Sequence, residues 1–126
     1  MRLLIVRHAE AAPGEPDELR SLTPEGREHA RALGERLRRD GLAPDAVVTS
    51  PLLRARETAA ALALGEPEAD QRLAPGASPD DFRDVAFGRG DTVVVVGHQP
   101  DCGHAVLELA GVEVPFPPAG TYELEL

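Results

Sequence analysis

The stretch Leu3-Leu4-Ile5-Val6-Arg7-His8 decides the fold of this chain. A short run of Val, Ile and Leu that ends in polar residues is typical of a strand buried inside a parallel sheet. A second run, Thr92–Val96, ends in Gly97-His98, and a third, Ala46–Thr49, is followed one helical turn later by Arg54. Open α/β sheets bind their ligands at the carboxyl ends of the strands. We therefore expect both histidines to meet the two arginines in one crevice.

The segments between these runs predict helices. Thr23-Pro24 combines a good N-cap residue with proline at the first helical position, and Gly41 lies just beyond the last turn. The apolar stripe of this helix consists of Gly26, Ala30, Leu33 and Leu37. Ser50-Pro51 repeats the cap-then-proline pattern before an Ala-rich helix that runs to about Leu64, and a later helix is expected over Asp101–Ala110.

The remaining segments are shorter. Between Gly65 and Gly90, where Pro, Gly and Asp are frequent, we expect one short strand around Gln71–Leu73 and one short helix after Ser78-Pro79. The alternation within Thr121–Leu126 favours a half-exposed edge strand, with antiparallel pairing as one option. Alternating strands and helices predict an α/β fold: a three-layer α/β/α sandwich with a mostly parallel central sheet, in a single domain spanning residues 1–126.

The composition restricts the classes of partner. A net charge of −9 disfavours binding to nucleic acid or to an anionic membrane, because both need an excess of basic surface. The single cysteine excludes an internal disulfide and fits a reducing compartment. Only four apolar residues separate Arg2 from Arg7, too few for a signal peptide or a membrane span. We expect a cytoplasmic protein.

Two arginines and two histidines in one crevice form a site for a dianion, with an imidazole that can attack it. His8 is the candidate nucleophile, because a neutral imidazole can attack phosphorus and become a covalent phosphohistidine. Arg7 and Arg54 would bind the phosphoryl oxygens as planar forks, and His98 would donate a hydrogen bond to one of them. Phosphate or sulfate is expected to bind such a site.

Each of these residues also has a plainer interpretation. The arginines could form ion pairs with Glu10 or Glu57, and the histidines could simply satisfy a strand end or cap a helix. Arg20 is a candidate at the rim, where it could reach the bound phosphate or a charge on the substrate. Gln99, beside the second histidine, is a further candidate for substrate binding.

Three blocks of sequence resemble those of a known family. They are Arg7-His8-Ala9-Glu10, Ser50–Ala59 and Gly97-His98, in this order, and Arg20–Gly26 fits the start of the family's first helix. Together they are similar to the histidine phosphatase (phosphoglycerate mutase-like) superfamily, over most of the chain from Arg2 to about Leu109. Within it, the short length and the block Arg72–Gly76 resemble most the phosphohistidine phosphatases of SixA type.

The resemblance implies the phosphoglycerate mutase-like fold and a phosphohistidine intermediate on His8. It implies that Arg54, rather than Arg56, is the phosphate ligand, and that no metal or other cofactor takes part. Ala9 departs from the pattern, since the family usually has glycine after the nucleophile. A methyl group is tolerable there if the backbone keeps φ below zero.

Two further histidines and the cysteine are not assigned a chemical role. His98, Cys102 and His104 follow one another closely, but their spacing does not match a paired-cysteine zinc site. His29 lies on the flank of the first helix stripe, where a structural role is expected.

A proton donor for the leaving group is not evident. Relatives that cleave phosphate esters usually carry a glutamate between the second helix and the second histidine, because an alkoxide leaves poorly unless it is protonated. Here Gln71–Phe82 has no obvious equivalent. The candidates are Glu10 and Asp81, with Asp80 beside it, although acids after Ser78 also suit a helix N-terminus.

These residues predict a metal-independent phosphatase that works through phosphohistidine on His8, with a phosphohistidine-bearing protein as its expected substrate. The first alternative is a phosphatase of small monoesters, such as a sugar or nucleoside phosphate. A mutase is disfavoured because the chain is too short to build walls that retain a phosphorylated intermediate. A non-catalytic phosphate-binding module is the remaining alternative, but binding alone would not need a nucleophile beside the arginines.

Overall fold

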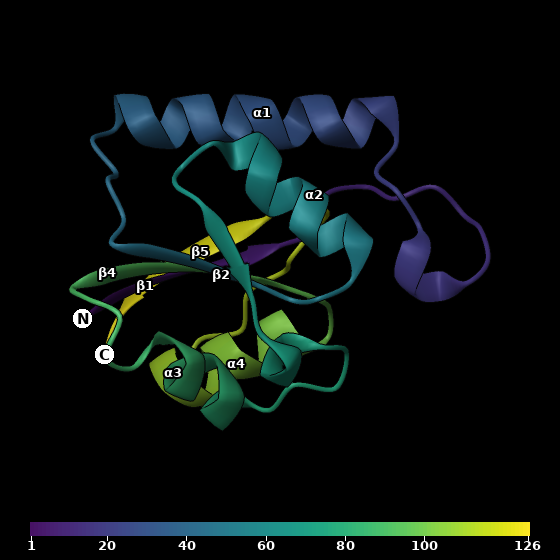
Figure 1. Ribbon diagram of the computed structural model, residues 1–126. Coiled ribbons are helices and arrows are strands. Elements are labelled where there is room, and N and C mark those ends of the chain that lie inside the picture. The colour runs from purple at the N-terminus through teal and green to yellow at the C-terminus, as the bar shows by residue number, and fades with distance from the viewer.

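The central sheet of the computed structural model has five strands in the order β3-β2-β4-β1-β5, and all 126 residues are described. The strands are β1 (Arg2–Arg7), β2 (Ala46–Thr49), β3 (Pro67–Ala69), β4 (Thr92–Gly97) and β5 (Thr121–Glu125). The helices are α1 (Pro24–Arg39), α2 (Leu53–Leu62), α3 (Pro79–Ala86) and α4 (Asp101–Ala110), with short 3₁₀ turns η1 (Asp17–Leu19) and η2 (Gln71–Leu73). Helices α1 and α2 cover one face of the sheet and α3 and α4 the other (Figure 1). The predicted three-layer sandwich is confirmed.

The apolar runs of β1 and β4 are uninterrupted because both faces of these strands are buried. Successive side chains of a strand point to opposite faces. Accordingly, Leu3 and Ile5 of β1 pack in the core under α3 and α4, whereas Leu4 and Val6 pack in the core under α1 and α2. β1 pairs in parallel with β4 and antiparallel with β5, which confirms the edge strand expected near the C-terminus.

Two glycines let α1 approach its neighbours closely. A Cβ atom on Gly26 would lie 2.2 Å from the carbonyl oxygen of Glu10, and one on Gly34 would lie 2.1 Å from that of Leu62. Neither distance can exist in a real structure, so only glycine allows these contacts. The first contact fixes the segment that follows β1 against α1, directly beyond His8.

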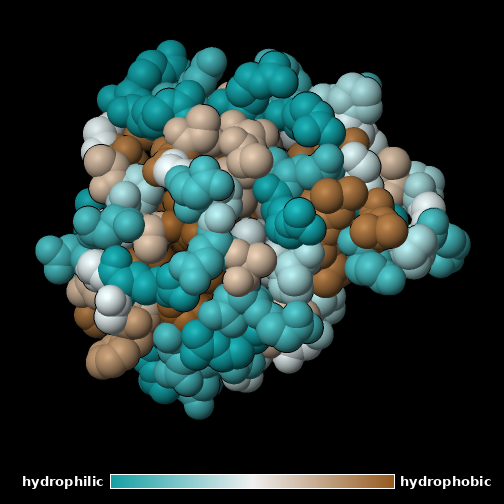
Figure 2. Space-filling model, in the orientation of Figure 1, coloured by the Kyte–Doolittle hydropathy of each residue, from teal (hydrophilic) through white to brown (hydrophobic).

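The predicted caps of two helices are confirmed. Thr23 Oγ1 accepts a hydrogen bond from the Gly26 backbone N–H at 2.9 Å, and Ser78 forms a reciprocal capping box with Asp81. The outer side of α1 is hydrophilic, as Figure 2 shows along its upper margin. None of the helices combines the length and apolar character that crossing a bilayer would require.

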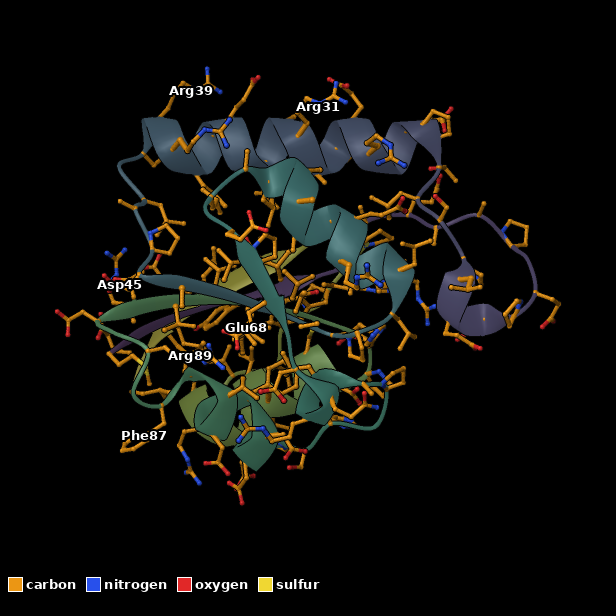
Figure 3. The ribbon with its side chains drawn as sticks, in the orientation of Figure 1. Arg31, Arg39, Asp45, Glu68, Phe87 and Arg89 are labelled. Atoms are coloured by element: carbon orange, nitrogen blue, oxygen red, sulfur yellow. The ribbon has the colours of Figure 1, made fainter.

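The predicted strand at Gln71–Leu73 is wrong, since this segment is the 3₁₀ turn η2. The Asp70 carboxylate accepts a hydrogen bond from the Arg72 backbone N–H at 2.9 Å, which turns the chain there. The strand lies earlier, where Pro67–Ala69 pairs with β2. An ion pair between Glu68 and Arg89, drawn facing each other in Figure 3, joins β3 to the segment that precedes β4.

The predicted cap-then-proline start of α2 is also wrong. The helix begins at Leu53, and its N-cap residue, Leu52, has no side-chain cap. The Ser50 hydroxyl accepts a hydrogen bond from the Leu52 backbone N–H at 3.2 Å, so it organises the turn before the helix instead. The helix ends at Leu62, ahead of the expected end, because Ala63 adopts a left-handed conformation with φ of 52°.

Candidate active site

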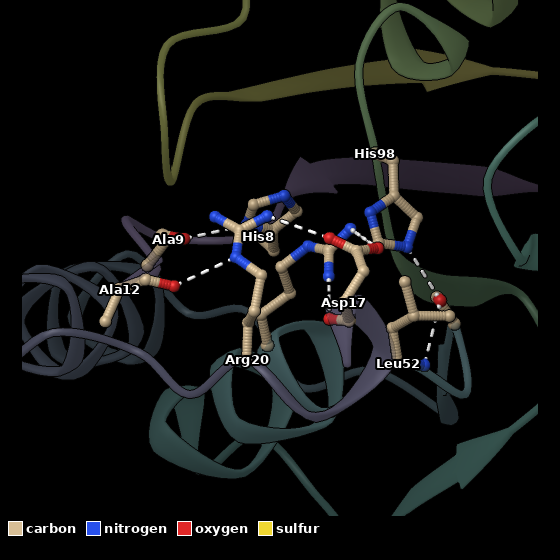
Figure 4. Close-up of polar contacts among 9 residues, drawn as sticks. His8, Ala9, Ala12, Asp17, Arg20, Leu52 and His98 are labelled. Atoms are coloured by element: carbon tan, nitrogen blue, oxygen red, sulfur yellow. Dashed lines mark hydrogen bonds and ion pairs between the residues drawn. The ribbon is translucent and has the colours of Figure 1, made fainter. Parts of the chain in front are cut away.

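The register of the sheet brings the two histidines together. Arg7 of β1 pairs with Gly97 of β4, so His8 and His98 leave the sheet at the same carboxyl edge. The His8 backbone N–H donates to the Gly97 carbonyl oxygen at 3.0 Å. The two imidazole rings lie 5.2 Å apart between centroids, tilted by 59° (Figure 4).

The surroundings of His8 leave one ring nitrogen free to act as a nucleophile. Its Nδ1 lies 2.7 Å from the carbonyl oxygen of Ala9. A carbonyl oxygen only accepts, so Nδ1 carries the proton and Nε2 keeps its lone pair. Burial lowers the pKa of His8, and the charges of Arg54, Arg7 and Arg20 lower it further, against the hydrogen bond to Ala9. The ring is therefore neutral at neutral pH.

Ala9 fits its place after His8. It is fully buried, its backbone N–H donates to Thr58 Oγ1 at 3.0 Å, and its φ is not positive. The backbone at Ala9 therefore meets the condition stated above for an alanine at this position, which is a φ below zero.

His98 is held by the turn that precedes α2. Its Nε2 lies 2.7 Å from Ser50 Oγ, and its Nδ1 is buried without a hydrogen-bond partner. Burial, followed by the charges of His8 and Arg54, lowers the pKa of His98 to about 3. Both histidines are thus neutral before an anion enters.

The arginines provide the positive charge of this edge. Arg54 is buried; its Nη1 donates to the Asp17 carbonyl oxygen at 3.0 Å and its Nη2 to the Asp17 carboxylate at 3.3 Å. Arg7 donates from Nη1 to the Phe116 carbonyl oxygen at 2.9 Å, and its Nε is buried without a partner. Arg20 donates to the Ala12 carbonyl oxygen and, at 3.0 Å, to the Asp17 carboxylate.

The plainer interpretation of the arginines, ion pairs with Glu10 or Glu57, is not observed. Glu57 accepts hydrogen bonds from Ser21 and from the Leu22 backbone, and it pairs with Arg27. Arg7 makes no ion pair at all, which leaves its positive charge available to a ligand.

The Gln99 side chain bonds to the start of the helix that follows it. Its Oε1 accepts a hydrogen bond from the Gly103 backbone N–H at 2.7 Å, so the side chain caps the first turn of α4. This arrangement also occupies one of the helix N–H groups that an anion would otherwise use. The prediction that Gln99 binds substrate therefore has no contact to support it.

The carboxylates predicted as proton donors are engaged elsewhere. Glu10 accepts a hydrogen bond from Thr23 Oγ1 at 2.8 Å, Asp81 belongs to the capping box of α3, and Asp80 pairs with Arg83. None of them forms a hydrogen bond or ion pair with the histidines or arginines of this edge. Each carboxylate is engaged in a local cap or helix-surface pair, so no contact in the structure supports its role as a proton donor.

The carboxylate that the site does contain is Asp17, which the sequence interpretation missed. It bridges Arg20 and Arg54, and the hydrogen bond from Arg20 is the main reason that its pKa lies below the ordinary value (Figure 4). Asp17 lies in an irregular segment without periodicity and far along the chain from Arg54. The only available signal was its position three residues before Arg20.

The remaining histidines and the cysteine lie apart. Cys102 is buried, which raises the pKa of its thiol to about 12, whereas His104 is exposed on α4. His29 is exposed on α1. No three His, Cys, Asp or Glu side chains form a group suited to a metal ion.

Comparison with known proteins identifies the family. Residues 3–89 match the model of the histidine phosphatase superfamily, branch 1. The chain belongs to this superfamily. An uncharacterised protein of Picosynechococcus sp. is 38% identical over 115 residues, which cover 82% of this chain and 69% of that protein.

Solved structures share the whole fold. The protein histidine phosphatase SixA complexed with tungstate is 25% identical, with a TM-score of 0.89 over 100% of this chain and 88% of that chain. A SixA proposed as a phosphohistidine phosphatase, from Nakamurella multipartitia, is 29% identical, with a TM-score of 0.80 over 97% of this chain and 83% of that chain. The predicted SixA-like member of the superfamily is confirmed, and the family supports phosphatase activity.

Proposed function

We propose that the protein is a metal-independent phosphatase that transfers a phosphoryl group to Nε2 of His8 and then to water, and that its substrate is a phosphohistidine-bearing protein. The observation that carries this proposal is the state of His8. Its Nδ1–H donates to the Ala9 carbonyl oxygen, which leaves the Nε2 lone pair free. Two arginines supply positive charge at the same edge: Arg7, whose Nε has no partner, and Arg54, whose Asp17 carboxylate a ligand can displace.

In the first step Nε2 of His8 attacks phosphorus, and the bond from phosphorus to the leaving imidazole breaks. Arg7 and Arg54 neutralise the phosphoryl oxygens, where charge develops during transfer. Ser50 accepts a hydrogen bond from Leu52 and can donate its own proton to Nε2 of His98. Nδ1 of His98 then carries a proton, and this buried N–H finds its partner in a phosphoryl oxygen.

In the second step a water molecule attacks the phosphorylated His8. The bond between phosphorus and Nε2 breaks, inorganic phosphate leaves, and the ring returns to its neutral form. The arginines supply the positive charge that a metal ion supplies in other phosphatases, so the proposal needs no metal.

The shape of this edge favours a substrate carried on a protein. The cavities of the molecule are lined by other residues, and none of them includes His8, Arg54 or His98. A small metabolite would lack enclosing walls, whereas a histidine presented on a protein surface can reach an open site. Leu19 of η1 is 61% exposed beside Asp17, and hydrophobic residues gather at this end of the molecule in Figure 2. They offer apolar contact to such a partner.

The decisive experiment follows labelled phosphate from a phosphohistidine protein through rapid, acid-free quenching. Wild-type protein should trap label on His8, with and without a chelator. His8→Ala should lose turnover by about a thousandfold or more while still binding phosphate or vanadate. His29→Ala, which changes an exposed histidine on α1, is the matched control and should behave as wild type.

Three results would contradict the proposal. Turnover that survives in His8→Ala excludes the covalent step, and activity lost to chelator but restored by zinc excludes metal independence. Preference in kcat/KM for a small sugar or nucleoside phosphate over the phosphohistidine protein would favour the monoesterase alternative.

A further inference from the structure

Asp17 is the carboxylate that contacts the arginines of the active site. Its Oδ1 accepts a hydrogen bond from Arg20 at 3.0 Å, and its Oδ2 accepts one from Nη2 of Arg54 at 3.3 Å. It lies on η1, outside the sheet, and its side chain is more than half exposed. Its charge also reaches His98, where it opposes the lowering of the imidazole pKa. The charged or titratable groups around Asp17 are thus Arg20, Arg54 and His98.

An incoming phosphoryl group competes with Asp17 for Arg54. The phosphoryl dianion carries more charge than a carboxylate and needs the same Nη2 donor. Arg54 is buried and its Nη1 is held by the Asp17 carbonyl oxygen, so the exposed carboxylate is the partner that can move. Once released from Arg54, the exposed carboxylate would lie beside the phosphoryl group that has replaced it on this arginine, on the side open to solvent.

We propose that Asp17 is the proton donor to the leaving group and then the base for the attacking water. This inference rests on the proposed transfer to His8. Binding of the dianion removes the favourable charge of Arg54 from the carboxylate and places negative charge beside it. Both changes act against the hydrogen bond from Arg20, which is the main cause of the lowered pKa of Asp17 in the free protein, and so favour the neutral acid.

The proton balance closes over the two steps. With a phosphoester, Nε2 of His8 bonds to phosphorus, the bond from phosphorus to the ester oxygen breaks, and this oxygen takes the carboxyl proton of Asp17. Water then attacks the phosphohistidine and gives a proton back to the Asp17 carboxylate, while the bond from phosphorus to Nε2 breaks. The products are an alcohol and inorganic phosphate, and both side chains return to their starting forms.

This role extends the activity of the site to phosphomonoesters. A phosphohistidine substrate whose other ring nitrogen carries a proton releases neutral imidazole and needs little acid catalysis. An alkoxide or phenolate leaving group needs the proton. Asp17 therefore matters little for phosphohistidine and increasingly for esters whose alcohols are weaker acids.

The test measures kcat and kcat/KM on a phosphohistidine peptide and on a series of aryl and alkyl phosphates. In Asp17→Asn the loss should grow along the series, from under about threefold for nitrophenyl phosphate to about a hundredfold for an alkyl phosphate. The limb of the pH profile at which an acid must be protonated should disappear, and Asp17→Glu should restore part of the rate on poor leaving groups. Glu18→Gln, a neighbouring exposed carboxylate without a contact, is the matched control.

The outcomes separate this inference from the proposed function. An equal loss for every leaving group, with an unchanged pH profile, would overturn proton donation and leave Asp17 as a residue that only positions Arg54. No turnover by the wild type, even of nitrophenyl phosphate, and no label on His8 would overturn the transfer itself. Inhibition of Asp17→Asn by inorganic phosphate shows that the variant is folded and still binds the anion. A loss of activity confined to alkyl phosphates in this variant would then support proton donation by Asp17.

Discussion

The carboxyl edge of the sheet and the rest of the fold differ in how their buried polar groups are satisfied. We call the strands, helices and loops that do not contact the candidate active site the framework. At the carboxyl edge, Nε of Arg7 and Nδ1 of His98 are buried without a hydrogen-bond partner. In the framework, the buried carboxylate of Asp101 accepts hydrogen bonds from the backbone of Gly76 and Ala77. A buried polar group without a partner costs free energy, so the unpaired atoms identify where the fold leaves capacity for a ligand.

This difference predicts opposite responses to substitution. Changes at the carboxyl edge should alter activity or the pH dependence of stability, with little effect on stability at neutral pH. Changes in the framework should lower stability and leave the activity of the folded molecules nearly intact.

The largest effect expected at the carboxyl edge is on the pH dependence of stability, through His98. Its pKa falls from 6.5 to about 3 on folding. The unfolded chain therefore binds this proton more tightly, so the free energy of unfolding falls as the pH drops below 6.5 and levels off below about 3. The loss over that range is on the order of 4 kcal/mol for this group. Urea unfolding at a series of pH values measures it.

The matched variants make this prediction specific. His98→Gln removes the titrating ring, so its free energy of unfolding should vary less over the same pH range than that of the wild type. His104→Gln, exposed on α4, should retain the wild-type dependence. If His98→Gln also retained it, the neutral buried state of His98 would be wrong.

The next largest effect is on catalysis, through Arg54. Arg54→Lys keeps the positive charge but loses the planar fork, so kcat/KM should fall by about a hundredfold. The free energy of unfolding should change by less than about 1 kcal/mol. Arg56→Lys, on the same helix but lining a separate cavity with Glu57 and Pro67, is the control. A lysine that served as well as the arginine would show that forked binding is not needed.

The framework was largely predictable from the sequence, because the apolar runs of β1 and β4 and the cap of α1 are local signals. The exceptions have local causes that composition does not reveal. Pro67–Ala69 has few apolar residues and becomes a strand only because its backbone pairs with β2. Ser50 follows the pattern of a cap, but its hydroxyl bonds to the Leu52 backbone N–H in the preceding turn and to Nε2 of His98.

The carboxyl edge was predictable only where a residue follows a strand. His8 and His98 could be placed beside each other because parallel strands end at a common edge. Asp17 could not, since its contact with Arg54 depends on how an irregular segment folds back across the site. The glycine contact of Gly34 with Leu62 was missed for a similar reason, because helix-to-helix distances are set by tertiary packing.

Within the framework, Gly34→Ala should have the larger effect. The added Cβ would meet the Leu62 carbonyl oxygen at 2.1 Å, and backbone cannot move aside as a flexible side chain can. The strain of overpacking exceeds the gain in helix propensity, so the free energy of unfolding should fall by about 2 kcal/mol. Glu35→Ala, on the exposed side of α1, is the control. Unchanged stability in Gly34→Ala would show that α1 and α2 can separate freely.

The smallest effect expected is from Asp101→Asn. The Asp101 carboxylate holds the Gly76 and Ala77 backbone N–H groups at 2.9 and 3.2 Å, which ties the loop before α3 to the start of α4. Asparagine keeps one acceptor oxygen but loses the charge, so the free energy of unfolding should fall by about 1 kcal/mol. Asp101 lies only three residues after His98, so this variant tests whether a framework residue next to the active site affects stability alone. If kcat/KM fell by more than about threefold while stability held, Asp101 would belong to the site, and the division between a ligand-binding edge and a satisfied framework would fail.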